Sequence, residues 1–392
     1  MNVRIRVRTA CAALVVLGLT AGPLAGTALA APSPTGVVRE TVSPKTVSPK
    51  TDKALREALK GIPDKDTTAA LVRVGGKAGT WRGSAGVRDL ASGRKALEHG
   101  RFRAGSTTKV VTAAVVLQLA AEGRIDLDGH VQTYLPGLLS KAFEPITVRQ
   151  LLTFTSGLKP GATLGDVNGE GYERRFETLT PEAVVASSVA AGPAFCPGKR
   201  QKYANIDYTV LGLLIEKVTD DTYEHQAAVR VLQPARMHHT SFPGGPDPRI
   251  HGPHNRGYQI LADGRLVDAT EWNMSDRWAA GDMISTTEDL ERLLFALFRG
   301  RLVPQPLLDK EMFTLPDVPN ATMSAGLQQF KLDEDTVVWA KSGARPGYGT
   351  AIAATRDLSR TLVYSVNATD AKSEEMNPVA ERIVGAAFGT GS

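Results

Sequence analysis

A serine and a lysine lie three residues apart where a long apolar run begins, in Ser106-Thr107-Thr108-Lys109. The first turn of a helix leaves backbone N–H groups without partners and carries partial positive charge. Lys109 would lie on the same face of the helix as Ser106. Its amine could then take the proton of the serine hydroxyl, and the helix start beside them could bind an anion. This spacing predicts acyl transfer by an activated serine. The alternative is a serine that only caps the helix.

The same four-residue spacing occurs twice more, from Ser92 to Lys95 and from Ser156 to Lys159. Ser92 lies in a segment typical of a turn, and Ser156 is followed by Gly157 and Pro160, which continue a helix poorly. Only Ser106 precedes a sustained helical run, at 110–122. Context therefore favours Ser106 as the nucleophile.

A second motif is Tyr203-Ala204-Asn205, which follows a Pro-Gly pair and precedes a helical run. We expect it on a tight loop that projects into a cleft. A phenol near two ammonium groups could have a lowered pKa and relay a proton, and Asn205 could hold both a substrate amide and Lys109. The alternative is a buried tyrosine followed by an asparagine cap.

A third motif, Lys341-Ser342-Gly343, ends a predicted strand. Lys341 would supply positive charge for a substrate carboxylate and lower the pKa of neighbouring amines, and the Ser342 hydroxyl could donate to the same carboxylate. Gly343 would leave room for a ligand along the strand edge. The N–H of Ala344 could complete an oxyanion hole with that of Ser106.

Other chemistries lack their motifs. The seven histidines form no His-Glu-x-x-His, no Gly-x-Ser-x-Gly surrounds Ser106, and there is no glycine-rich phosphate loop. We therefore expect neither a metal nor a cofactor. The formal charge of +5 falls to +2 if residues 1–30, with their three arginines and no acids, are removed. A nearly neutral chain gives no reason to expect a nucleic-acid partner.

These motifs need elements to hold them. Strands are expected at 69–74 and 80–88 and, as an antiparallel meander, at 336–340, 349–355 and 361–367. Helices are expected between them, at 110–122, 147–154, 181–190, 206–218 and 288–298, and a last one at 373–388. Either Asn205 or Asp207 could cap the helix at 206–218, and Thr286 or Thr287 the one at 288–298. The pattern predicts an α/β (α+β) fold in which both ends of the chain form one antiparallel sheet, flanked by helices, with an inserted all-α lobe and a cleft between the two.

The N-terminal residues read as an export signal. Residues 1–30 combine an arginine-rich start, an apolar core and a small-residue cleavage site; an uncleaved anchor is the alternative. Residues 31–53 are rich in proline and predict a disordered tether. The folded domain should span 54–388, with 54–105 and 320–388 in the α/β lobe and 106–319 in the helical lobe. Without the signal one cysteine remains, Cys196, which we expect to be partly buried.

In this order, and on a helix start, a loop and a strand edge, the three motifs resemble those of the serine penicillin-recognising hydrolases, in particular the group of class C β-lactamases and secreted D-alanyl-D-alanine carboxypeptidases. The similarity covers about 54–388 and extends to further segments, at 102–109, 117–128, 146–158 and 280–286. Related sequences usually carry His where Phe154 stands, a position not expected to do chemistry. Lys341 replaces the His typical of the carboxypeptidases and is also common in β-lactamases.

The resemblance implies a β-lactamase/transpeptidase-like fold and an acyl-enzyme on Ser106. It implies Lys109 as base and Tyr203 as relay, Asn205, Lys341, Ser342 and Gly343 as substrate-binding residues, and the N–H groups of Ser106 and Ala344 as the oxyanion hole. The expected substrate is a peptidoglycan stem peptide or another peptide ending in D-alanyl-D-alanine, with β-lactams as inhibitors. The expected location is extracellular, either free or associated with the cell wall. No stable membrane anchor is expected. A β-lactamase, an esterase and a non-catalytic penicillin-binding sensor are the alternatives.

Overall fold

The computed structural model describes residues 45–243, 245–334 and 336–389. The predicted signal peptide and residues 31–44 of the predicted tether lie outside the described residues. In the described part of the chain, no helix combines the length and apolarity needed to cross a membrane.

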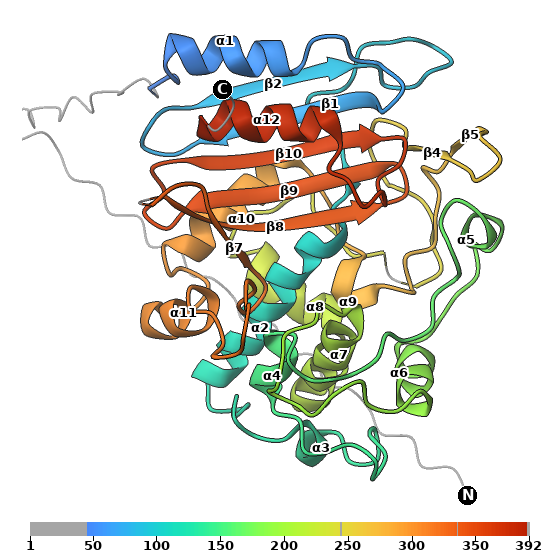
Figure 1. Ribbon diagram of the computed structural model, residues 1–392, viewed down its shortest axis with the longest axis vertical. Helices are drawn as coiled ribbons and strands as arrows, with labels where there is room; N and C mark the ends of the chain where they lie inside the picture. Colours follow the sequence, from blue (N-terminus) through green and yellow to red (C-terminus); the bar gives the residue numbers. More distant parts are fainter. Residues whose placement is uncertain (1–44, 244, 335, 390–392) are drawn as a thin grey trace, which may run out of the picture. The chain divides into compact units, whose positions relative to one another are not determined.

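Strands from both ends of the chain form one antiparallel sheet (Figure 1). They are β1 (Thr67–Gly75), β2 (Trp81–Gly86), β7 (Gln328–Lys331), β8 (Val337–Arg345), β9 (Tyr348–Thr355) and β10 (Thr361–Ala368). Their order is β2-β1-β10-β9-β8-β7, so the pairing of β1 with β10 joins the two ends of the chain. This sheet confirms the predicted fold class.

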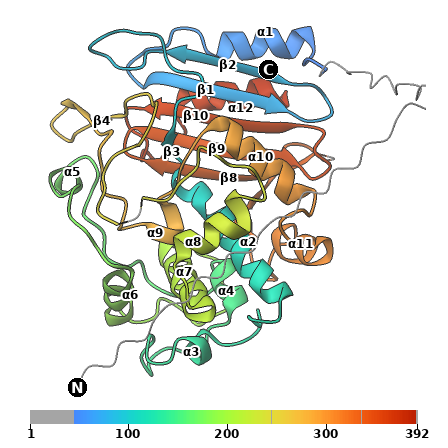
Figure 2. The ribbon, with the colours of Figure 1, turned by 180° about the vertical axis from the view of Figure 1, so that it is seen from behind.

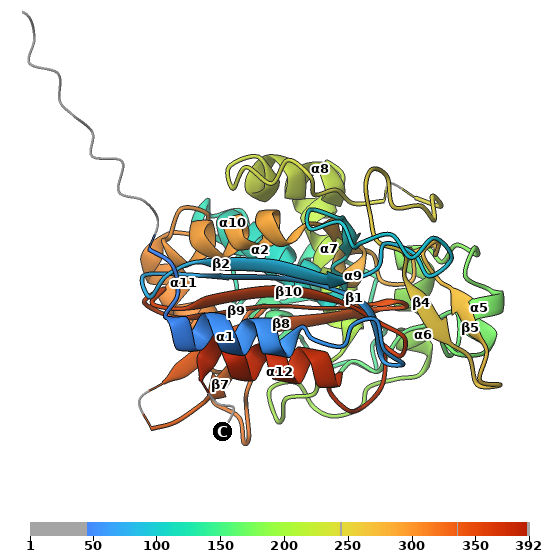
Figure 3. The ribbon, with the colours of Figure 1, turned by 90° about the horizontal axis from the view of Figure 1, so that it is seen from above.

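Helices cover both faces of the sheet. On one face α1 (Pro49–Ala58) packs against α12 (Pro378–Phe388), and α10 (Thr287–Phe298) lies on the other (Figure 3). Seen from behind, α10 crosses the central strands (Figure 2). Because both faces are covered, β1 is buried along almost its whole length, and 69–74 are apolar except for Arg73.

Other helices build a mostly helical part beside the sheet. They are α2 (Thr108–Ala121), α3 (Val131–Tyr134), α4 (Val148–Leu152), α5 (Glu170–Glu173), α6 (Pro181–Ala190), α7 (Asn205–Thr219), α8 (Tyr223–Ala227), α9 (Trp278–Gly281) and α11 (Gln305–Met312). Nearly every residue of α2 is buried, because α7, α8, α9 and α11 surround it. Two short ladders complete the fold, β3 (Phe102–Arg103) with β6 (Ile284–Ser285) and β4 (Tyr258–Ile260) with β5 (Leu266–Asp268).

The folded part starts earlier than predicted. Thr46 forms a β-bridge with Thr80, Val47 is buried, and α1 begins at Pro49. The Ser48 hydroxyl accepts a hydrogen bond from the N–H of Thr51, so this Ser-Pro pair is a helix cap followed by proline in the first turn. The predicted tether is therefore wrong at its C-terminal end, where proline starts a helix.

The predicted lobe boundary is also wrong for α10. This helix lies within 106–319, which we assigned to the helical lobe, but it packs on the sheet. Its buried leucines recur at helical spacing and face β1, β9 and β10: Leu290, Leu293, Leu294 and Leu297. Thr286 caps α10, as predicted. The last helix begins at Pro378 rather than at 373, because Asn377 caps it by accepting hydrogen bonds from the N–H groups of Val379 and Ala380.

Candidate active site

Ser106 lies on a tight turn that leads into α2. The turn is a 3₁₀ helix, Gly105–Thr107, and α2 itself starts at Thr108. Gly105 has a positive φ of 53°, and a Cβ there would lie 2.6 Å from the backbone N of Ala344. Glycine is therefore required both by the backbone conformation and by the contact with β8. The turn fixes Ser106 directly against the strand that carries the third motif.

Lys109 is buried, and its Nζ contacts three oxygens. Nζ lies 3.2 Å from the Ser106 Oγ, 2.7 Å from the Asn205 Oδ1 and 2.6 Å from the carbonyl oxygen of Ala280. Asn205 is the first residue of α7 and gives this helix no side-chain cap, so the predicted capping role is wrong. Its side chain instead holds the lysine, and the structure thereby brings together the first two motifs.

The surroundings of Lys109 favour a neutral amine. Burial, and after it the charge of Lys341, hold the pKa of Lys109 well below its ordinary value; Arg277 acts in the same direction, and Asp207 opposes it. This confirms the prediction that Lys341 lowers the pKa of a neighbouring amine. A lysine with a low pKa, in hydrogen-bond contact with a serine hydroxyl, can serve as a base.

Tyr203 approaches the serine from the opposite loop. Its hydroxyl donates to the Ser106 Oγ over 2.8 Å, and the Nζ atoms of Lys109 and Lys341 lie 5.0 Å and 5.1 Å from the centre of its ring. Burial nevertheless raises the pKa of Tyr203 to about 12, so the predicted lowering is wrong. The loss of solvent outweighs the hydrogen bond to Ser106 and the charge of Arg277, which lower this pKa, and the phenol stays protonated at neutral pH.

Phe154, which we expected to be unimportant for chemistry, packs directly against this tyrosine. The two ring centres are 4.7 Å apart, and a second buried ring, Tyr208, lies 5.2 Å from Phe154. Phe154 has a φ of 59°, an uncommon conformation for a bulky residue, and its carbonyl accepts a hydrogen bond from the N–H of Lys202. Its packing holds the ring of Tyr203. Sequence periodicity could not reveal this contact, because it joins two loops.

Asp207, the other predicted cap of α7, does not cap this helix either. It is buried on α7, and its Oδ1 accepts a 2.5 Å hydrogen bond from the Ser156 hydroxyl. Burial raises the pKa of Asp207 well above its ordinary value. This hydrogen bond joins α7 to the loop that follows α4, and the raised pKa favours the neutral form of the carboxyl. Ser156, one of the two rejected Ser-x-x-Lys serines, thus has a structural partner.

The third motif occupies an edge of the sheet. β7 pairs with β8 only from Val337 to Ala340, so in the described part of the chain 341–345 have no strand on that side. A two-residue turn joins Arg345 to Tyr348, so these two residues form a hydrogen-bonded pair of the ladder. Hydrogen-bonded pairs alternate along an antiparallel ladder, and the N–H and C=O groups of Ser342 and Ala344 therefore point away from β9, to the open edge. An extended ligand could pair there.

Gly343 lets this edge approach the serine turn. A Cβ at Gly343 would lie 2.0 Å from the carbonyl oxygen of Ala104 and 2.8 Å from the backbone N of Ser106. No side chain fits in that space. The close contact brings the backbone N atoms of Ser106 and Ala344 near each other, and an oxyanion hole would need both N–H groups to point at one oxygen.

Lys341 and Ser342 lie on opposite faces of β8, as neighbours on a strand must. Lys341 is buried in the site, where its Nζ donates to the carbonyl of Ser342 over 2.8 Å, whereas Ser342 is exposed. Burial lowers the pKa of Lys341 to about 8. At neutral pH this lysine is still mostly charged and can attract an anion.

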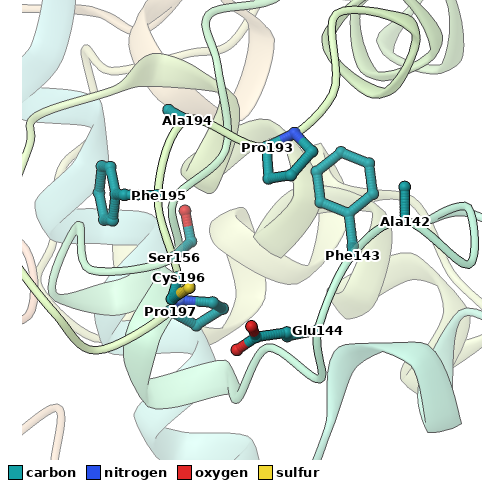
Figure 4. A pocket seen from close by; sticks show the side chains of 9 residues that line it. All are labelled: Ala142, Phe143, Glu144, Ser156, Pro193, Ala194, Phe195, Cys196 and Pro197. Atoms are coloured by element: carbon teal, nitrogen blue, oxygen red, sulfur yellow. The ribbon is translucent and has the colours of Figure 1, made fainter.

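A separate hollow is lined by 142–144, Ser156 and 193–197 (Figure 4). It measures about 190 Å³, and Phe143, Pro193 and Cys196 are among its lining residues. Ser156, whose hydroxyl donates to Asp207, also lines it. Cys196 is exposed, not partly buried as predicted, and the neighbouring Glu144 raises the pKa of its thiol. A thiol with a raised pKa is a poor nucleophile, so Cys196 does not suit nucleophilic catalysis.

The chain belongs to the β-lactamase family, whose characteristic sequence pattern matches residues 55–386. The match covers the sheet, the helical part and all three motifs. Together with the fold, it identifies a serine penicillin-recognising hydrolase, a serine hydrolase of the β-lactamase and penicillin-binding superfamily.

A curated relative, "Protein flp" of Staphylococcus aureus (strain MRSA252), is 31% identical over 209 residues. The aligned part is 53% of this chain and 40% of that protein, so the chain spans less than half the length of this relative.

Two solved structures cover most of the chain. A D-stereospecific amidohydrolase from Streptomyces sp. superposes with a TM-score of 0.76 and 31% identity, over 87% of this chain and 99% of that one. A D-amino acid amidase from Ochrobactrum anthropi SV3, complexed with L-phenylalanine amide, superposes with a TM-score of 0.72 and 24% identity, over 87% and 99% of the two chains. The second likeness concerns the fold alone.

Proposed function

We propose that the protein is an exported serine D-alanyl-D-alanine carboxypeptidase that works through an acyl-enzyme on Ser106. The observation that carries this proposal is the convergence of Lys109 and Tyr203 on the Ser106 Oγ, at 3.2 Å and 2.8 Å, beside the open edge of β8. Nucleophile, base, relay and a place for an extended peptide are then all within one site.

Acylation follows from the contacts of Lys109. A neutral amine has two N–H donors, and Asn205 and the carbonyl of Ala280 accept both. Its lone pair is then left for the hydroxyl of Ser106. As the Oγ attacks the scissile carbonyl, a C–O bond forms, the serine proton moves to Lys109, and the carbonyl electrons move to oxygen, where the N–H groups of Ser106 and Ala344 stabilise the charge.

Collapse of this intermediate needs a proton on the leaving amine. Tyr203 touches the Ser106 oxygen and, being protonated, can pass its own proton to the leaving nitrogen and take one from Lys109 in exchange. The C–N bond breaks, and the acyl group stays on Ser106. Water then attacks the ester with proton transfer to the same base, which releases the acid and restores the serine.

The open edge of β8 supports removal of one terminal residue. A peptide antiparallel to β8 would place its leaving end toward Lys341. Beyond Lys341 the edge is occupied, because β7 pairs with β8 from Ala340 back to Val337. We infer that about one residue fits beyond the scissile bond. Lys341 and Ser342 would hold its free carboxylate, since Lys341 is cationic below a pKa of about 8.

The cellular setting is part of the same proposal. A peptidoglycan stem peptide would be the substrate outside the cell, where the predicted export signal would send the protein. β-Lactams would acylate Ser106 as inhibitors, because they present an acyl group to the same oxyanion site. A β-lactamase would use the same residues but hydrolyse this acyl-enzyme quickly.

A second candidate is a D-amino acid amidase. The observation that favours it is the 31% identity to the D-stereospecific amidohydrolase, whose chain is covered over 99% of its length. An amide substrate has no carboxylate for Lys341, so the two candidates differ in the use they make of this residue.

One experiment separates these functions. Purified mature protein is incubated in parallel with an N-acyl-D-alanyl-D-alanine peptide, a D-amino acid amide, a short acyl ester and a chromogenic β-lactam. We expect D-alanine release at the highest kcat/KM, together with stable labelling by penicillin. Faster ammonia release from the amide would replace the first candidate by the second. Rapid β-lactam turnover or ester cleavage alone would indicate a β-lactamase or an esterase, and labelling without any turnover a sensor.

A further inference from the structure

We propose that a groove on the outer face of the sheet, beside the open edge of β8, binds an apolar side chain on the leaving residue of the substrate. The groove has a volume of about 510 Å³, within the range of small-molecule sites. The inference rests on the proposed function, because it names the kind of residue that this site would release.

The groove is continuous with the site because of the alternation of β8. Ser342 and Ala344 lie on the face opposite Lys341, and both line the groove together with Gly343 between them. Ala344 is the proposed oxyanion donor, and Ser342 the proposed carboxylate donor. One end of the groove therefore begins where the scissile bond would lie.

From there the groove runs back along β8 and across the sheet. Its floor continues through Ala340 and Val338, and its walls come from β7 and from α12. An antiparallel peptide on this edge would have its C-terminal end in that direction. The side chain that enters the groove would then belong to the residue released, not to the acyl part.

The rim contains two large apolar side chains exposed to water. Phe330 on β7 is 44% exposed, and Met376, just before α12, is 49% exposed. They line the same groove from its two walls, so a ligand between them would remove apolar surface of both from water. Two such residues facing one hollow favour an apolar occupant.

Acidic residues limit what else can enter. Asp370, Glu374 and Glu375 line the groove, all on the segment between β10 and α12. They would repel a second carboxylate on the leaving residue. The groove therefore fits residues such as D-leucine or D-phenylalanine and disfavours D-glutamate.

The test compares N-acyl-D-alanyl peptides that end in D-alanine, D-leucine or D-glutamate. We expect a kcat/KM about tenfold higher for D-leucine than for D-alanine, the size typical of a small apolar pocket, and the lowest value for D-glutamate. The exposed rim is then altered in the double variant Phe330→Ser, Met376→Ser, which should lose most of the D-leucine preference and keep the D-alanine rate.

Phe176→Ser is the matched control, because Phe176 is 50% exposed and does not line the groove. It should leave the preference unchanged. Equal rates for D-leucine and D-alanine, or the same loss in the control as in the rim variant, would overturn the proposal.

A binding measurement separates the groove from the reaction. Calorimetric titration of the Ser106→Ala variant with the same peptides should give a lower Kd for D-leucine than for D-alanine. If the Kd is lower for D-leucine but the unaltered protein cleaves no peptide, the result would support the groove and contradict the proposed carboxypeptidase. Equal Kd values together with cleavage would contradict the groove and support the carboxypeptidase.

Discussion

The two sides of Ser106 differ in how completely the protein fills them. On the helical side, buried groups from α2, α7 and two loops surround the lysine and tyrosine with protein partners. On the strand side, an edge of β8 has no neighbouring strand in the described residues, and an apolar groove adjoins it. The filled side suits proton transfer, which needs fixed distances, and the open side suits selection among substrates.

Replacing the buried amine should have the largest effect. Lys109→Met keeps most of the volume but removes the base and leaves the Asn205 Oδ1 and the Ala280 carbonyl without their donor. We expect kcat/KM for D-alanine release to fall by roughly 10²–10⁴-fold, the usual contribution of general base catalysis. The measurement is single-turnover acylation, with circular dichroism to verify folding. Unchanged acylation by a folded variant would exclude Lys109 as the base.

A side chain added where β8 contacts the serine turn should have the next largest effect on activity. In Gly343→Ala the new Cβ would lie 2.0 Å from the Ala104 carbonyl oxygen, so the serine turn and β8 must separate. Loss of an oxyanion donor costs roughly 10²–10³-fold in kcat. Gly389→Ala serves as control: nothing lies within 4 Å of a Cβ there, but Gly389 caps α12 with a φ of 77°, so this variant should lose stability and keep kcat. Nearly normal kcat in Gly343→Ala would show that these two N–H groups do not share one oxygen.

The pH dependence should distinguish the lysines. Lys109 must be neutral to act as base, so activity should rise with pH as this lysine loses its proton, at a pH well below 10.5. Lys341 must be charged to hold a carboxylate, so kcat/KM for peptide acids should fall again above pH about 8. Substrates that end in an amide should lack this alkaline decrease. A decrease near pH 8 with both substrates would assign it to another group.

Loss of the ring that supports Tyr203 should have a moderate effect. Phe154→Leu removes a contact between ring centres 4.7 Å apart, worth about 0.5–1.5 kcal/mol, and should lower kcat about three- to tenfold with little change in KM. In the control Phe313→Leu, a similar contact with Phe298 is lost without touching Tyr203. The control should lose stability but keep kcat, and equal losses of kcat would deny Phe154 a positioning role.

The smallest effect is expected at Asp207. If its buried carboxyl is neutral, Asp207→Asn replaces one uncharged acceptor by another and should change kcat less than about twofold. The acidic limb of the pH profile should stay where it is. A shift of that limb to lower pH would mean that Asp207 is charged and raises the pKa of Lys109.

The contrast between the two sides also explains what the sequence could predict. Strands and helices with regular apolar spacing, such as β1 and α6, lie within one or two residues of the predicted positions. The first two motifs were recognisable because each lies where a helix begins. The third lies within β8, which continues to Arg345 and does not end at 340 as predicted. Their convergence depends on contacts between elements far apart in the sequence, such as the packing of the serine turn against β8, and no local pattern encodes these contacts.

Contacts between loops escaped prediction for a physical reason. Phe154 and Tyr203 are 49 positions apart on irregular segments, so neither has a periodic pattern that would place it. The pKa of Tyr203 was predicted in the wrong direction because a sequence shows neighbouring charges but not the loss of water. The groove beside β8 likewise depends on where α12 and β7 lie over the sheet.

Mass spectrometry of the trapped acyl-enzyme tests the central claim most directly. The protein is mixed with an N-acyl-D-alanyl-D-alanine peptide, quenched in acid within one turnover and digested. We predict that the peptide containing Ser106 gains the mass of the N-acyl-D-alanyl group, and that Ser106→Ala gains none. An adduct on another residue, or D-alanine release that persists in Ser106→Ala, would contradict it.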